Sequence, residues 1–169
     1  QIIYNLPSGY TRPFIWVRDS EKAGILAKIA NNPWATSVYN SMVSRVAADL
    51  ASHQSNRDTF LRALPVDWTL ATPKFKTIPA YAESTVRFPA EAKYNDALDC
   101  AVLFYLTGDA NYARCAADIL HNATKTLLPV VASTSTANGG WIFQSDLLKE
   151  ARVTGTQLPT IYDFLYSWL

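Results

Sequence analysis

Apolar positions dominate the middle of the chain, and their spacing predicts two helices. The first, about Lys93–Leu106, is apolar at almost every position of its second half, the pattern of a helix buried on all sides. The second, about Asn111–Leu127, repeats apolar residues at i, i+4, i+7 and i+8, which predicts one core-facing stripe: Tyr112, Ala116, Ile119 and Leu120. Gly108 suits the left-handed residue that ends the first helix, and Asp109 suits the cap of the second. The pair is therefore predicted to be a helical hairpin.

Apolar spacing also predicts helices on both sides of this hairpin. Arg18–Ala30 forms a first helix, with four apolar positions: Ala23, Leu26, Ala27 and Ala30. It ends at Asn31-Asn32, because the residue before a proline resists the helical region. A second helix starts at Pro33-Trp34 and repeats apolar residues every four positions: Val38, Met42, Val46 and Leu50. Two further helices are predicted to open at Asn138 and at Leu158.

The remaining segments are predicted to be irregular. Prolines and aromatics in residues 1–17 favour an extended N-terminal arm on a helical domain of residues 18–169. Residues 53–92 contain four prolines, and connections of this length are usually functional or packed by their own aromatics. The last helix reaches Leu169 in mid-period without a cap. We therefore expect an N-terminal part of a larger domain, truncated at its C-terminal end, or a short chain that a second polypeptide completes.

Composition narrows the function classes. A length of 169 residues suits one domain with a sizeable core. The net charge is +1 and 17% of residues are charged, so no global field favours nucleic acid or an acidic membrane. No apolar run is long enough to span a bilayer. We expect neither nucleic acid nor membrane as a partner. The start at Gln1 suits a processed, secreted protein, extracellular or periplasmic, and Asn122-Ala-Thr124 is a glycosylation sequon of a glycoprotein.

The two cysteines, Cys100 and Cys115, lie at similar distances from the turn of the predicted hairpin, one on each helix. Two interpretations stay open. A disulfide staples the hairpin if the two Cβ atoms face each other. Alternatively, both are buried thiols that pack beside alanines.

Three sequence motifs resemble one superfamily. They are Pro33-Trp34 in a first helical pair, the hairpin Tyr105-Leu-Thr-Gly-Asp-Ala-Asn-Tyr-Ala113, and Ile161-Tyr-Asp-Phe-Leu-Tyr166. Together they resemble the alginate lyase and heparinase II/III-like superfamily of polysaccharide lyases. The resemblance implies an all-α fold, an incomplete (α/α) toroid built from antiparallel helical hairpins. In this superfamily an Asn-His pair normally follows the helix at which this chain stops, and the catalytic Tyr usually lies further downstream. This chain has no Asn-His dipeptide, so the resemblance implies that both follow Leu169.

β-Elimination on a uronic acid removes the proton beside a carboxylate, which must first be neutralised. Within residues 138–161, the resemblance implies that Gln144 and Arg152 line the sugar groove. Trp141 either stacks on a sugar or fills the core at a helix start. Gln144 either binds a carboxylate or hydroxyl or is solvated. Arg152 either pairs with a uronate or forms a surface ion pair.

Further candidates lie elsewhere. Arg87 and Tyr81 belong to the long irregular segment, which can overhang the groove as a lid. His53 and His121 are expected to be exposed helix-end residues. The elimination chemistry needs no metal or other cofactor, and the chain shows no metal-binding or phosphate-binding motif.

The leading hypothesis is therefore a polysaccharide lyase acting on a uronic-acid-containing glycan, alginate-like or glucuronan-like. A second hypothesis is a glycoside hydrolase on an (α/α) barrel, with paired carboxylates at Asp96 and Asp99, or Glu91 and Asp96. A third is a non-catalytic helical-repeat module that binds carbohydrate through aromatic side chains.

Overall fold

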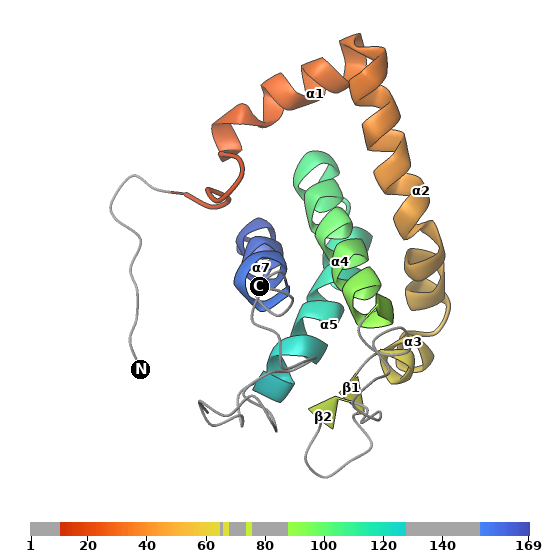
Figure 1. Cartoon of the computed structure of the whole chain (residues 1–169). Helices are drawn as coiled ribbons and strands as arrows, with labels where there is room; N and C mark the ends of the chain where they lie inside the picture. The colour runs from red at the N-terminus through yellow and green to blue at the C-terminus, as the bar shows by residue number, and fades with distance from the viewer. Residues whose placement is uncertain (1–10, 65, 68–73, 76–87, 128–152) are drawn as a thin grey trace.

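The structure is a computed structural model that describes residues 11–64, 66–67, 74–75, 88–127 and 153–169. Its elements follow in chain order: the 3-10 turn η1 (Asp19–Glu21), α1 (Lys22–Asn31), α2 (Pro33–Ser55), α3 (Arg57–Ala63), β1 (Val66–Asp67), β2 (Lys74–Phe75), α4 (Phe88–Thr107), α5 (Ala110–Leu127), the π-helical turn η3 (Val153–Gln157) and α7 (Leu158–Leu165). The two strands pair antiparallel over two residues each, and the rest of the regular structure among the described residues is helical (Figure 1). The predicted all-α class is confirmed.

The α4–α5 hairpin has the predicted form. Gly108 has φ +74°, and its N–H donates to the carbonyl of Phe104 at 2.7 Å, which closes α4. Asp109 Oδ1 accepts the N–H of Asn111 at 2.9 Å, which caps α5. No side chain of α4 between Asp96 and Leu106 is exposed, so this helix is buried on all sides as predicted.

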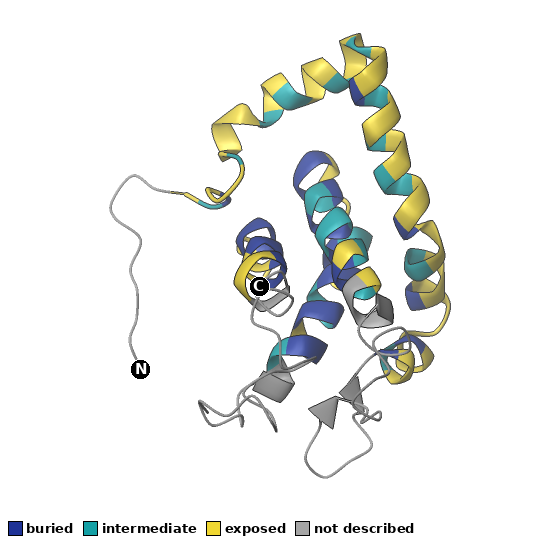
Figure 2. Ribbon diagram, in the orientation of Figure 1, coloured by how far each residue is buried: buried dark blue, intermediate teal, exposed yellow. Residues whose placement is uncertain are grey.

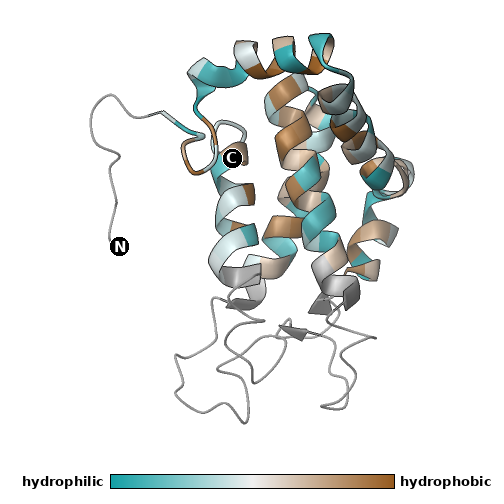
Figure 3. Cartoon of the chain, turned by 45° about the horizontal axis from the view of Figure 1, so that its top comes forward, coloured by the Kyte–Doolittle hydropathy of each residue, from teal (hydrophilic) through white to brown (hydrophobic). Residues whose placement is uncertain are grey.

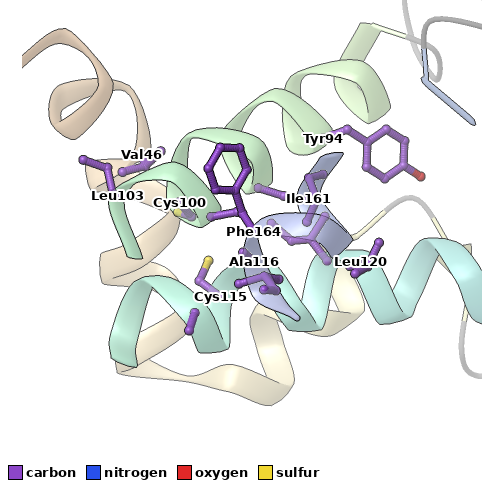
Figure 4. Close-up of a cluster of buried hydrophobic side chains, with 14 of the residues drawn as sticks. Val46, Tyr94, Cys100, Leu103, Cys115, Ala116, Leu120, Ile161 and Phe164 are labelled. Carbon is purple, nitrogen blue, oxygen red and sulfur yellow. The ribbon is translucent and has the colours of Figure 1, made fainter. Parts of the chain in front are cut away.

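Helix α4 lies at the centre of the molecule. α5, α7 and α2 all pack against it, and α7 also contacts α5 (Figure 1). Figure 4 shows their side chains meeting in one core. The largest fully buried apolar side chains of this core are Val46, Leu64, Tyr94, Leu103, Ile119, Ile161 and Leu165.

Helices α1 and α2 form the outer wall of the molecule, with many exposed residues along both (Figure 2). Asn32 breaks them apart with extended backbone angles of −126° and 118°, at the predicted position before Pro33. The predicted apolar positions of α1 do not face the core: Ala23, Leu26, Ala27 and Ala30 are exposed. Its partly buried face is formed by Ile25 and Ile29 instead, because only that side packs on α2 and α4.

Helix α3 was missed within the segment expected to be irregular. Asn56 caps it, since its Oδ1 accepts the N–H of Thr59 at 3.0 Å, and Phe60 carries its buried face into the core. Helix α7 ends at Leu165 rather than continuing to the last residue, although the N–H of Leu169 still reaches the carbonyl of Leu165 at 3.1 Å. The helix predicted to open at Asn138 lies outside the described residues.

Hydropathy varies along every described helix, with polar and apolar residues interleaved (Figure 3). Of these helices, none combines the length and apolar content that crossing a lipid bilayer requires.

Candidate functional site

The five residues predicted to bind substrate lie outside the described residues: Trp141, Gln144, Arg152, Arg87 and Tyr81. The described residues on either side of these segments do have a place in the fold. Residues 76–87 lead into the start of α4, and residues 128–152 connect the end of α5 to η3. Gln157 of η3 donates a hydrogen bond to Asn95 in the first half of α4, so η3 lies beside that part of α4. The start of α4, the end of α5 and η3 therefore all lie at the end of the bundle opposite the Gly108 turn (Figure 1).

A buried carboxylate organises the N-terminal residues. Asp163 of α7 is 0% exposed, and its Oδ2 accepts the backbone N–H groups of Phe14 and Ile15 at 2.8 and 2.9 Å. Its Oδ1 lies 2.7 Å from an Nη atom of Arg12. A buried charge is tolerated when it is paired and hydrogen-bonded in this way. Asp163 thus fastens residues 12–15 to α7. The sequence signal that could have identified this role is an ionisable residue, Asp163, within the apolar stripe of α7.

Residues of α1, α2, α4 and α7 line an apolar groove of about 440 Å³. Trp16 and Trp34 line this groove and have 54% and 66% of their surface exposed, and aliphatic side chains form most of its wall. Its few polar or charged groups include Lys28 and Asp99. Pyranose rings carry several hydroxyls that need hydrogen-bond partners, and this lining offers few. We therefore do not assign the groove to a polysaccharide.

Carboxyl groups meet between α2 and α4. Asp96 is hydrogen-bonded to Asp49, and burial together with the Asp49 charge raises the pKa of Asp96 to about 6. Asp49 Oδ1 is also paired with Lys93, while Asp99 Oδ2 lies 2.7 Å from Nε of Arg45.

This arrangement differs from the Asp96–Asp99 pair expected for a glycoside hydrolase, while the side chain of Glu91, the other predicted partner of Asp96, lies outside the described part of the chain. Asp96 pairs with Asp49 of another helix rather than with Asp99, which is engaged by Arg45. Two carboxyl groups in hydrogen-bond contact leave no room for a glycosidic bond and a water between them, which needs about 5 Å or more. The cluster instead links two helices.

His53 is 6% exposed, so the expectation of an exposed helix-end residue was wrong. Its Nε2 lies 2.7 Å from Asp118 Oδ2, and its ring packs edge-on against Phe60 at 5.2 Å. Arg57 donates two hydrogen bonds of 2.7 Å to the same carboxylate. Burial alone would raise the pKa of Asp118, but the hydrogen bonds from Arg57 and His53 outweigh it and lower that pKa below its usual value. The cluster ties α2 and α3 to α5. His121 is exposed, as predicted.

Cys100 and Cys115 are both fully buried, and the structure has them as free thiols. The two sulfur atoms face each other between α4 and α5 (Figure 4). The hydrogen bond between the two thiols, followed by burial, raises the pKa of Cys100 far above its usual value. A thiol held protonated in this way is unreactive.

Asn122, the predicted glycosylation site, is 1% exposed on α5. Its Nδ2 is buried without a hydrogen-bond partner among the described residues. A glycan needs an acceptor at the surface. The burial of Asn122 in this fold is unfavourable to a glycan there, and glycosylation of Asn122 stays a prediction.

Comparison with known proteins gives one informative relative. The chain is 27% identical over 157 residues to an endo-acting ulvan lyase of Formosa agariphila. The match covers 93% of this chain but 18% of that enzyme, so the chain spans less than a fifth of the relative's length. No protein-family profile and no solved structure matches the chain. The chain is therefore similar to a part of one polysaccharide lyase.

Proposed function

We propose that this chain is a helical part of a polysaccharide lyase that cleaves a uronic-acid-containing glycan by β-elimination. The observation that carries the proposal is the 27% identity to an endo-acting ulvan lyase, which extends over 93% of the chain rather than over one short motif. The α4–α5 hairpin and the packing of α2 and α7 around it are compatible with a piece of a helical toroid. The toroid would be completed by the rest of the same polypeptide or by a second chain.

The chain's contribution to the site would come from residues 76–87 and 128–152. Arg152 would pair with the uronate carboxylate, and Gln144 would donate a hydrogen bond to it or to a hydroxyl. Trp141 would stack on a sugar ring, while Tyr81 and Arg87 would close over the bound sugar. The general base would lie elsewhere in the protein. Such an enzyme meets its polymer outside the cell, so we also propose that it is secreted.

The proposal is tested with the full-length protein on soluble polyuronates, with product followed by the ultraviolet absorbance of the unsaturated uronate. Arg152→Ala and Gln144→Ala should each lose most of the turnover. Both variants should keep the circular dichroism spectrum of the native protein, which shows that they are folded. Asp58→Asn, which removes an exposed carboxylate of α3, serves as the matched control and should keep native turnover. Near-native turnover in both test variants would contradict the assignment of these two residues.

A further inference from the structure

Three aromatic rings surround one arginine on the outer side of α7. The guanidinium carbon of Arg12 lies 4.7 Å from the ring centre of Phe14, 5.4 Å from that of Tyr162 and 4.9 Å from that of Tyr166. The three aromatic residues are 36%, 42% and 48% exposed. We call Phe14, Tyr162 and Tyr166 the aromatic platform. It combines large apolar surfaces with phenol hydroxyls.

The platform is fixed before any ligand arrives. Tyr162 and Tyr166 are one turn apart on α7 and contact each other edge to face at 5.8 Å. Phe14 is held from the opposite side, because its own N–H and the Arg12 side chain both bond to Asp163. Rings that are already ordered lose little conformational entropy on binding.

The electrostatics of the platform favour an acidic ligand. An aromatic face is electron-rich and by itself repels a carboxylate. Here a cation contacts all three rings, and its partner Asp163 is fully buried while the Arg12 side chain is 19% exposed. The positive end of this ion pair is therefore nearer to the exposed rings, and it offsets their repulsion of anions.

Polar groups lie next to the platform. Tyr162 also lines a cleft of about 460 Å³ between α5 and α7, whose wall is mostly apolar and includes His121 and Thr124. Flat rings beside a cleft with hydroxyl and imidazole groups can accept both the apolar face and the hydroxyl edge of a sugar.

We propose that the aromatic platform binds pyranose faces of an acidic polysaccharide and holds that polymer away from the reacting bond. The proposal rests on the proposed function for the identity of the polymer, a uronate-containing chain. The observations behind the platform do not depend on the proposed function. They are three exposed rings, which Asp163 helps to order and which Arg12 contacts.

The test is affinity electrophoresis of the full-length protein in cold native gels that contain alginate, polyglucuronate or neutral dextran. The paired change Tyr162→Leu and Tyr166→Leu removes two ring faces but keeps apolar bulk over Arg12. The paired change Tyr162→Phe and Tyr166→Phe keeps the faces and removes the hydroxyls. Trp34→Leu removes an exposed aromatic side chain of α2 that does not belong to the platform. Thermal melts followed by circular dichroism check that each variant is folded.

We expect the leucine pair to bind the acidic polymers about tenfold more weakly, with the phenylalanine pair and Trp34→Leu within about twofold of the native protein. Dextran should retard none of them. Unchanged binding by a folded leucine pair, an equal loss in the phenylalanine pair or in Trp34→Leu, or equal retardation by dextran would each overturn the proposal.

The two proposals fail separately in these experiments. Cleavage to unsaturated products without any effect of the leucine pair on binding leaves the lyase and removes the platform. Binding that depends on the two rings, without unsaturated products, leaves the platform and removes the lyase.

Discussion

Asp163→Asn tests whether one buried carboxylate fastens the N-terminal residues to α7. The substitution keeps the size of the side chain but removes its charge. The native carboxylate accepts three hydrogen bonds of 2.7 to 2.9 Å, one of them from Arg12. Removing one partner of a buried ion pair costs about 3–5 kcal/mol. Because the Arg12 side chain keeps 19% exposure and regains some hydration, we expect the lower end, about 3 kcal/mol.

The assay is hydrogen exchange of the full-length protein, followed by mass spectrometry of a peptide that covers residues 11–18. In the native protein the N–H groups of Phe14 and Ile15 are protected by Asp163. A loss of about 3 kcal/mol in local opening corresponds to roughly a hundredfold faster exchange. Asp58→Asn makes the same chemical change at an exposed position and should leave this peptide unaffected.

A double-mutant cycle separates the ion pair from the backbone hydrogen bonds. Arg12→Leu alone leaves Asp163 buried with only its two backbone partners, and the double variant leaves no uncompensated charge. The double variant should therefore be less destabilised than the sum of the two single changes, by about 1 kcal/mol or more. Native exchange rates in Asp163→Asn, or strict additivity in the cycle, would refute the reasoning.

Three further predictions concern other buried groups. The pKa of Asp96 is raised to about 6 from 3.8, so the folded state binds more protons than the unfolded state between these values, and stability falls as pH rises through 6. The Asp96→Asn variant cannot ionise at this position and should be more stable than the native protein above pH 6, by about 1 kcal/mol after allowance for solvent screening. Thermal melts of both proteins one pH unit below and one above pH 6 measure this difference in stability. Parallel pH profiles for the two proteins would count against the prediction. Cys100 and Cys115 are both fully buried, so alkylation with iodoacetamide should label neither until denaturant is added, and rapid labelling of the folded protein would show that the core is open there. His53→Ala should destabilise the protein by about 2–3 kcal/mol, because it removes a buried ring and a partner of Asp118, but should not change turnover at a temperature where the variant is folded; a selective loss of turnover would make His53 catalytic rather than structural.

Local patterns predicted much of the fold because they act over short distances. The α4–α5 hairpin followed from apolar spacing, Gly108 and Asp109, and the break between α1 and α2 followed from Pro33. The buried face of α1 did not follow, since small alanines occur on several sides of that helix and only packing selects Ile25 and Ile29.

The chemistry of individual polar residues was harder to predict because it depends on partners distant in sequence. His53 and Asp118 are 65 residues apart, and Arg12 and Asp163 are 151 apart. Neither pair has a sequence motif. Asn122 does have a local motif, the glycosylation sequon, but that motif does not predict that the side chain is buried.

The most direct test of the account is the chemistry of the product that the full-length protein makes from a polyuronate. Chains are incubated with the protein, and the new ends are identified by ultraviolet absorbance and mass spectrometry. A lyase leaves a 4,5-unsaturated uronate at each new non-reducing end and adds no water to the products. Saturated products that have gained one water per cleavage would identify a hydrolase, and intact polymer that stays bound would identify a binding module; either result would contradict the proposed function.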